Sequence, residues 1–231
     1  PRDKRKIGVR SDFLLPKVAI LDPLLTLSLP QSLTASTGMD ALTHAIECYT
    51  APRATLISDM AAERAIELIA EHLPVAYANG GDVAARYGML MGSYLAGLSL
   101  AIANVGAVHA LAQTVGGLYG VRHGVANSLF LPYVMAFNRI GCREKYAQVA
   151  ALMGEVVEDL SLDEASERAV DCVRRLSLSL GIPQKLRDLD IPEDGLDRVA
   201  AWCLETQGRI ATNNPRTLGL EDAQAILREA Y

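Results

Sequence analysis

The sequence has 231 residues, half of them hydrophobic, and a formal net charge of −5. This length and apolar content allow a substantial buried core, so the chain is expected to be globular. The sequence has no cluster of Lys and Arg to neutralise phosphates, which argues against a nucleic-acid partner. Aromatic residues make up only 5%, while Ala and Leu dominate. Because Ala and Leu lose little side-chain entropy in a helix, the composition predicts a mainly α fold, a helical bundle.

The cysteines are widely spaced, without a CxxC pair, and no apolar signal segment opens the chain. This pattern predicts reduced thiols in a cytoplasmic protein. The chain starts with Pro1-Arg2-Asp3 rather than Met. We therefore expect it to come from the middle of a longer protein.

Residues 1–35 are punctuated by prolines and contain two short branched apolar stretches, Ile7 to Val9 and Val18 to Leu21. Each is too short for a stable helix, so both are predicted to be extended. The expected division is a connector over 1–35 and a helical domain over 36–231.

Helical periodicity begins at Thr37. Pro52 and Pro74 should end the first two helices, since proline lacks an N–H and clashes with the preceding turn. Gly154, Gly181 and Gly208 are candidate C-caps. The predicted helices cover residues 37–50, 55–73, 82–104, 107–117, 123–138, 143–153, 163–180, 194–207 and 220–230.

No charged residue occurs between Arg86 and Arg122, a run long enough to span a bilayer. The run is interrupted by glycine, serine, asparagine, His109 and Gln113, which favours close packing inside a protein core. We predict a buried central helix pair and no membrane partner.

The first candidate for chemistry is the pair Asp40 and His44, which a helix would place on one face. Such a pair can chelate one metal ion. Alternatively, Thr37 is an N-cap and Asp40 completes a capping box, with His44 packed or exposed. A D-x3-H pair alone does not distinguish these two interpretations.

A second cluster follows in Val108-His109-Ala110-Leu111-Ala112-Gln113 and continues to His123. A helix carrying His109 should end at Gly116-Gly117, and a loop should bring His123 to the start of the next helix. Two helices can thus direct imidazoles at one point. Imidazole with carboxylate suits Fe(II), Zn, Ni or Mn, and the absence of thiolate argues against a structural zinc site.

Three stretches together resemble the iron-containing (group III) alcohol dehydrogenases. They are T-G-M-D-A-L-T-H-A-I-E-x-Y, V-H-A-L-A, and R-H-G-V-A-N-x-x-x-L-P, and the upstream L-P-K-V-A-I-L-D-P and the late N-P-R agree. The resemblance implies a C-terminal helical domain whose Asp40, His44, His109 and His123 hold a catalytic divalent metal, Fe2+ first and Zn2+ as an alternative. It also implies a separate N-terminal Rossmann-like domain, absent from this chain, that binds NAD or NADP.

Other residues are more ambiguous. Glu47 could orient a ligand, but a solvated or packing glutamate is favoured. Lys6 matches a family lysine near the cofactor, and the alternative is a surface lysine. His72 is predicted to be structural or exposed, at a helix end. Gln113 replaces a histidine that in many relatives is thought to relay the alcohol proton, and glutamine cannot titrate near neutral pH.

The function implied by the resemblance is hydride transfer between NAD(P) and a small alcohol or aldehyde, in a homo-oligomer. Because no G-x-G-x-x-G loop follows a strand, this chain alone is expected to be inactive. One alternative is a glycerol dehydrogenase-like or dehydroquinate synthase-like relative, which the Asp plus three His pattern disfavours. The other is a metal-stabilised helical interaction module without catalysis. An open coordination position beside a cleft would separate the module from the enzyme.

Overall fold

A computed structural model describes residues 11–14 and 16–231 of the chain. These residues form α-helices and short 3-10 turns, with no β-strand among them. The mainly α fold is confirmed. The α-helices are α1 Gln31–Thr50, α2 Leu56–Ala78, α3 Val83–Ala103, α4 Ala107–Tyr119, α5 His123–Asn138, α6 Arg143–Leu152, α7 Leu162–Ser179, α8 Leu196–Ala211 and α9 Leu220–Glu229.

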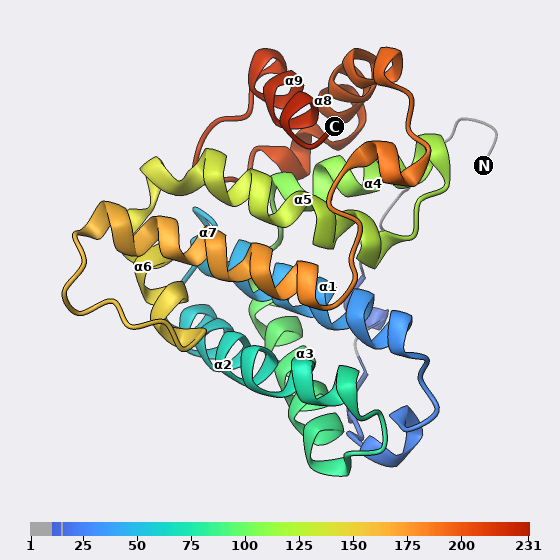
Figure 1. Ribbon diagram of the computed structural model, residues 1–231, viewed down its shortest axis with the longest axis vertical. Coiled ribbons are helices and arrows are strands. Elements are labelled where there is room, and N and C mark those ends of the chain that lie inside the picture. The colour runs from blue at the N-terminus through green and yellow to red at the C-terminus, as the bar shows by residue number, and fades with distance from the viewer. Residues whose placement is uncertain (1–10, 15) are drawn as a thin grey trace.

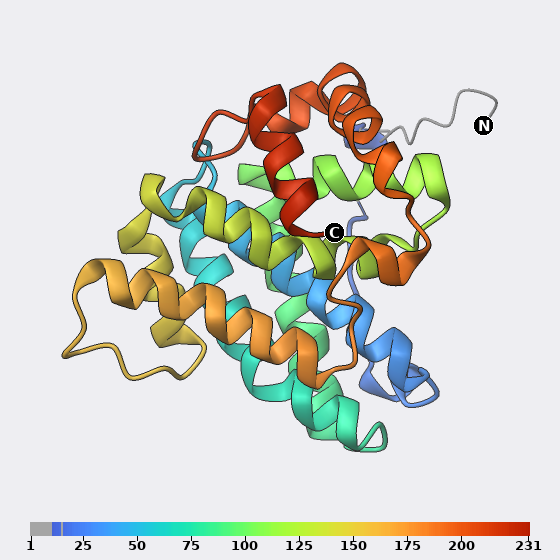
Figure 2. The same ribbon diagram turned by 45° about the horizontal axis from the view of Figure 1, so that its top comes forward.

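Helix α1 occupies the centre of the bundle (Figure 1). It packs against α2 and α3 on one side and against α5 on the other, while α4 packs against α5 and α8. In Figure 2, α8 and α9 lie at the opposite end of the molecule from α2 and α3. One hydrophobic cluster joins these helices, with Met39, Leu42, Ile46, Leu111 and Phe130 fully buried. Residues on α1, α4 and α5 can therefore meet inside the bundle.

The first helix starts earlier than its periodicity predicts. Helix α1 begins at Gln31, directly after Pro30. Thr37 lies inside it, where its hydroxyl donates to the Leu33 carbonyl oxygen at 2.7 Å. The capping-box alternative for Thr37 and Asp40 is therefore wrong, because Thr37 does not precede the helix. The side chains of Asp40 and His44 belong to the third and fourth turns of a long helix.

The second helix begins as expected but does not stop before Pro74. Thr55 caps α2 in a capping box with Ser58, and the helix continues through Pro74 to Ala78. Packing against α1 and α3 outweighs the backbone hydrogen bond that proline removes. His72 is therefore not at a helix end. Its ring packs over Gly88 of α3, where an added Cβ would lie 1.9 Å from the His72 ring.

The charge-free run forms α3 and α4, which meet at an angle of 101°. Among the described residues no single helix is long and apolar enough to cross a membrane, and only this bent pair reaches that length and apolar content when its two helices are taken together. Helix α4 is buried as predicted over most of its length. Helix α3 is buried on one face only, and its other face exposes Tyr87, Tyr94, Leu98 and Ile102.

Glycines end fewer helices than predicted. Gly154 and Gly181 follow α6 and α7 with left-handed φ values of 88° and 68°. Gly208 instead lies inside α8, and α4 passes through Gly116-Gly117 to a left-handed Gly120.

Within 1–35, Val18 to Leu21 forms no strand and Pro23–Thr26 is a 3-10 turn. The stretch Ile7 to Val9 lies outside the described residues.

Candidate metal centre

The structure brings the four predicted ligands together from three helices. Asp40 and His44 come from α1, His109 from the first turns of α4, and His123 is the first residue of α5. Ligand atoms of Asp40, His44 and His109 all lie within 4.8 Å of one another. His123 Nε2 lies 3.9 Å from Asp40 Oδ1, as does His109 Nε2. The closest pair is His44 Nε2 and His109 Nε2, 3.1 Å apart.

Two oxygen acceptors determine the tautomers of His44 and His109. His109 Nδ1 lies 2.5 Å from Glu47 Oε2, and His44 Nδ1 lies 2.8 Å from the backbone oxygen of Asp40. Carboxylate and carbonyl oxygens only accept hydrogen bonds, so Nδ1 carries the proton in both rings. In the neutral form of each ring the lone pair is then on Nε2.

In neutral rings the two Nε2 lone pairs, 3.1 Å apart, repel unless a cation or a donor hydrogen lies between them. The Asp40 carboxylate, 21% exposed, adds a negative charge to the same point. This donor set fits a divalent cation, because neutral imidazole nitrogens and a carboxylate oxygen are ordinary ligands of Fe(II) and Zn(II). The residues could thus hold one metal ion.

Glu47 has a larger role than the sequence indicated. Its side chain is 7% exposed, and its two oxygens take separate partners. Oε1 accepts from the Val108 backbone N–H at 2.7 Å, while Oε2 accepts from His109. The interpretation as a solvated glutamate is wrong. Glu47 orients the imidazole ring of His109, as carboxylates commonly do for metal-binding histidines.

Asn127, which the sequence reasoning did not single out, lies at the centre of the cluster. Its Nδ2 is 2.5 Å from Asp40 Oδ1, 3.0 Å from His109 Nε2 and 3.1 Å from His123 Nε2. The residue is fully buried, and its Oδ1 has no hydrogen-bond partner in the described part of the chain. Asn127 sits four residues after His123, so helical spacing on α5 was the available signal.

The cluster is closed on one side and open on the other. The side chain of His109 is 3% exposed, whereas that of His123 is 38% exposed. Burial, and then the neighbouring His109, lower the pKa of His44 below its ordinary value of 6.5. A lowered pKa keeps the His44 ring neutral, the form in which imidazole binds metal.

None of the remaining predicted residues makes a described hydrogen bond to the cluster. Gln113 follows His109 by one helical turn on α4, is partly exposed, and makes no side-chain hydrogen bond to another described residue. Lys6 lies outside the described residues. His72 lies on α2, with its Nε2 3.9 Å from Glu71.

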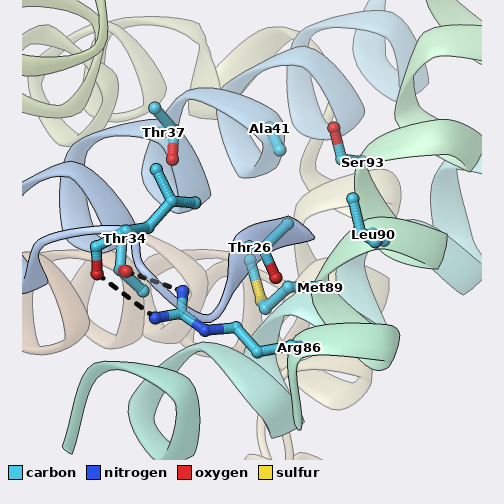
Figure 3. A pocket seen from close by; sticks show the side chains of 10 residues that line it. Thr26, Thr34, Thr37, Ala41, Arg86, Met89, Leu90 and Ser93 are labelled. Carbon is cyan, nitrogen blue, oxygen red and sulfur yellow. Dashed lines mark hydrogen bonds between the residues drawn. The ribbon is translucent and has the colours of Figure 1, made fainter. Parts of the chain in front are cut away.

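A separate cavity of about 120 Å³ runs along α1 and does not include the four predicted ligands in its lining. Figure 3 shows the Arg86 side chain of α3 reaching toward Thr34 beneath this cavity. Arg86 is buried and donates to Thr34 Oγ1 at 2.8 Å and to the Gly80 carbonyl at 2.9 Å. These contacts fasten α3 to α1 and to its own preceding loop, so we assign Arg86 a structural role.

Comparisons with known proteins identify the family of the chain. A family model described as "Fe-containing alcohol dehydrogenase family, C-terminal" matches residues 34–231. The 1,3-propanediol dehydrogenase of Klebsiella pneumoniae is 46% identical over 94% of this chain and 56% of its own length. The NAD-dependent methanol dehydrogenase of Bacillus methanolicus is 39% identical over 98% of this chain and 59% of its own.

Solved structures show the same fold. A crystal structure of 1,3-propanediol oxidoreductase matches with a TM-score of 0.91 at 46% identity, over 94% of this chain and 56% of that one. An archaeal alcohol dehydrogenase from a Red Sea brine pool matches with a TM-score of 0.94 at 29% identity, over 100% and 58%. The chain thus spans a little over half the length of these relatives. It belongs to the iron-containing alcohol dehydrogenase family, whose C-terminal domain it matches.

Proposed function

We propose that Asp40, His44, His109 and His123 bind one divalent metal ion, Fe2+ first and Zn2+ as the alternative. The observation that carries this is the 3.1 Å approach of the His44 and His109 Nε2 atoms, both of which bear lone pairs. The partial exposure of His123 and Asp40 supports a catalytic ion with an open position over a saturated ion in an interaction module.

The proposed activity is oxidation of a small alcohol or reduction of the matching aldehyde with NAD or NADP, in the enzyme that includes a nucleotide-binding domain. Relatives named for 1,3-propanediol, methanol and lactaldehyde support this substrate class. When bound, the metal supplies Lewis-acid polarisation of the substrate oxygen, and the nicotinamide exchanges the hydride. Lys6 is proposed to contact the cofactor. A homo-oligomer and a cytoplasmic location stay predictions, as does the division at residue 36.

The residues of this chain prepare and orient that centre. Glu47 holds His109 with its proton on Nδ1, and the Asn127 amide donates to Asp40 Oδ1 and so orients that carboxylate. Gln113, on the same face of α4 as His109, is proposed to line the substrate side without binding the metal. Because its amide does not titrate near neutral pH, the alcohol proton is proposed to leave through water or a cofactor hydroxyl.

The experiment pairs two proteins after loading with Fe(II) or Zn(II). One is this chain alone, and the other is this chain fused behind the nucleotide-binding half of the Klebsiella pneumoniae relative. Short alcohols are offered with NAD and with NADP, and reduced cofactor is followed by absorbance. We expect turnover in the fusion and none in the chain alone. A folded, metal-loaded fusion without turnover on any short alcohol would contradict the proposed activity.

A further inference from the structure

The loop between α8 and α9 contains Asn213, Asn214, Pro215 and Arg216, far from the ligands in sequence. Asn213 and Asn214 are both buried, at 8% and 6% exposure. Buried amides need hydrogen-bond partners, and the identity of those partners shows what the loop holds in place.

Asn213 holds the elbow between α3 and α4. Its Nδ2 lies 2.9 Å from the Ala103 carbonyl oxygen and 3.1 Å from those of Asn104 and Val105. These are three successive carbonyls at the end of α3 and in the turn that follows. A side chain 108 positions away thus satisfies the backbone where the chain turns toward His109.

The elbow is sharp and its backbone is strained. The two helices meet at 101°, and Asn104 has a φ of 65° and ψ of 165°, a region that favours glycine. Such a conformation persists only where surrounding contacts hold it. Gly106 leaves no space beside the loop, since an added Cβ would lie 2.8 Å from the Asn213 carbonyl oxygen.

The elbow leads directly into the His109 ligand. Two residues after Gly106, the Val108 N–H donates to Glu47 Oε1, and the next residue, His109, contacts Glu47 Oε2. A shift of the elbow would therefore move both groups that Glu47 binds.

Asn214 makes the corresponding contact to the other ligand-bearing helix. It exchanges two hydrogen bonds with Asn138, the last residue of α5, at 2.9 Å and 2.7 Å. Arg216 adds a guanidinium 3.9 Å from the Phe137 ring centroid and donates to the Phe137 carbonyl oxygen. Helix α5 carries His123 at its opposite end.

We propose that Asn213 and Asn214 are positioning residues of the metal centre, Asn213 acting on His109 through the elbow and Asn214 acting on His123 through α5. This inference rests on the proposed metal centre. Neither residue touches the ligands, so the effect on metal binding arises from the geometry of α4 and α5. By binding both the α3–α4 turn and the end of α5, the loop fixes the position of α4 relative to α5.

The test titrates the purified chain with Co(II), in competition with a chelating dye, and records the visible ligand-field spectrum. Asn213→Ala and Asn214→Ala should each bind Co(II) about tenfold more weakly than the unmodified chain, with an altered spectrum. Asn213→Ser, which keeps one short donor, should lie between alanine and asparagine. It also serves as the measurement if Asn213→Ala does not fold.

Val149→Ala is the matched control, because Val149 is fully buried but lies on α6, which carries no ligand. Urea unfolding compares the loss of stability among the variants. Weaker Co(II) binding in the asparagine variants, with Val149→Ala binding normally at similar loss of stability, is the expected result. Unchanged Co(II) affinity in both asparagine variants, or equal weakening in Val149→Ala, would overturn the positioning role alone. Absence of Co(II) binding by the unmodified chain would overturn the metal centre and this inference together.

Discussion

Glu47 and His109 are joined by a contact of 2.5 Å between Oε2 and Nδ1, both groups being almost fully buried. The second oxygen of Glu47 accepts a hydrogen bond from the Val108 backbone N–H. The carboxylate therefore binds both the His109 ring and the helix turn that carries it. This relationship gives His109 one orientation and one tautomer before any metal binds.

Replacement of Glu47 by glutamine should therefore weaken metal binding. Glutamine retains the size of the side chain, but the His109 Nδ1–H would no longer face a full negative charge. In one orientation of the amide, its NH2 group would face that N–H, and the two donors would repel each other. We expect Glu47→Gln to lower Co(II) or Zn(II) affinity by roughly 10–100-fold. Chelator competition measures this, with Glu67→Gln on exposed α2 surface as the control. Equal affinity in Glu47→Gln and the unmodified chain would show that Glu47 does not orient the ligand.

Asn127 should matter to the same measurement for a different reason. Its amide N–H donates to Asp40 Oδ1 and orients that carboxylate, whose remaining lone pairs stay available for a metal ion. Replacement by leucine keeps the branched shape of the side chain, with a larger volume, and removes the donor. We expect Asn127→Leu to reduce metal affinity by about tenfold and to change the Co(II) spectrum. A leucine variant that binds metal with the native spectrum would count against this role.

The sequence was most informative where a short local pattern determines a helix boundary or identifies a candidate ligand. Helix α5 begins at His123 and ends at Asn138, as predicted, and the four ligand candidates were all taken from three short motifs. It was least informative where tertiary packing overrides local preference. Pro74 is tolerated inside α2, and α1 extends back to Gln31, since both segments pack along neighbouring helices.

Glu47 and Asn127 could not be assigned because their roles depend on burial. A glutamate three residues after a histidine faces the same side of a helix whether that side is solvent or core. Only the approach of α4 to α1 excludes water from Glu47 and places His109 beside it. In the same way, the partial exposure of α3 follows from what packs beside it, which its apolar composition does not reveal.

The cysteines should be unreactive in the folded chain. Burial raises the pKa of Cys48 and Cys172 to about 12, and that of Cys142 and Cys203 to about 11. Only the thiolate reacts with disulfide reagents, so little labelling is expected at pH 8 in the native chain and four equivalents after denaturation. Rapid labelling of the native chain at pH 8 would contradict these shifts.

The same shifts predict how stability changes with alkaline pH. In the unfolded chain the thiols ionise near the ordinary value of 9.0, whereas in the folded chain they remain protonated to higher pH. The contribution of the protonated thiols is therefore complete below pH 9 and is lost as pH rises toward 11 to 12. Urea unfolding at pH 8 and pH 10 measures the difference, and replacement of Cys203 by alanine should reduce it.

Gln113 should be dispensable for metal binding. Gln113→Ala and Gln113→His are expected to keep the metal affinity of the unmodified chain, because neither removes one of the four proposed ligands. In the fusion enzyme, Gln113→His adds a group with an ordinary pKa near 6.5 on the His109 face of α4. We expect a new ionisation near neutral pH in the rate profile. Identical profiles, where chemistry limits the rate, would argue against a position beside the reacting proton, and loss of metal in Gln113→Ala would make Gln113 a ligand.

The most direct test of the metal centre is anomalous diffraction from crystals of the chain grown with Co(II), Fe(II) or Zn(II). We expect one strong peak about 2.0–2.3 Å from a carboxylate oxygen of Asp40 and from Nε2 of His44, His109 and His123. Crystals of the metal-saturated chain would contradict the proposed metal centre if their only peak lies elsewhere, or if the bound ion does not contact one of these four side chains.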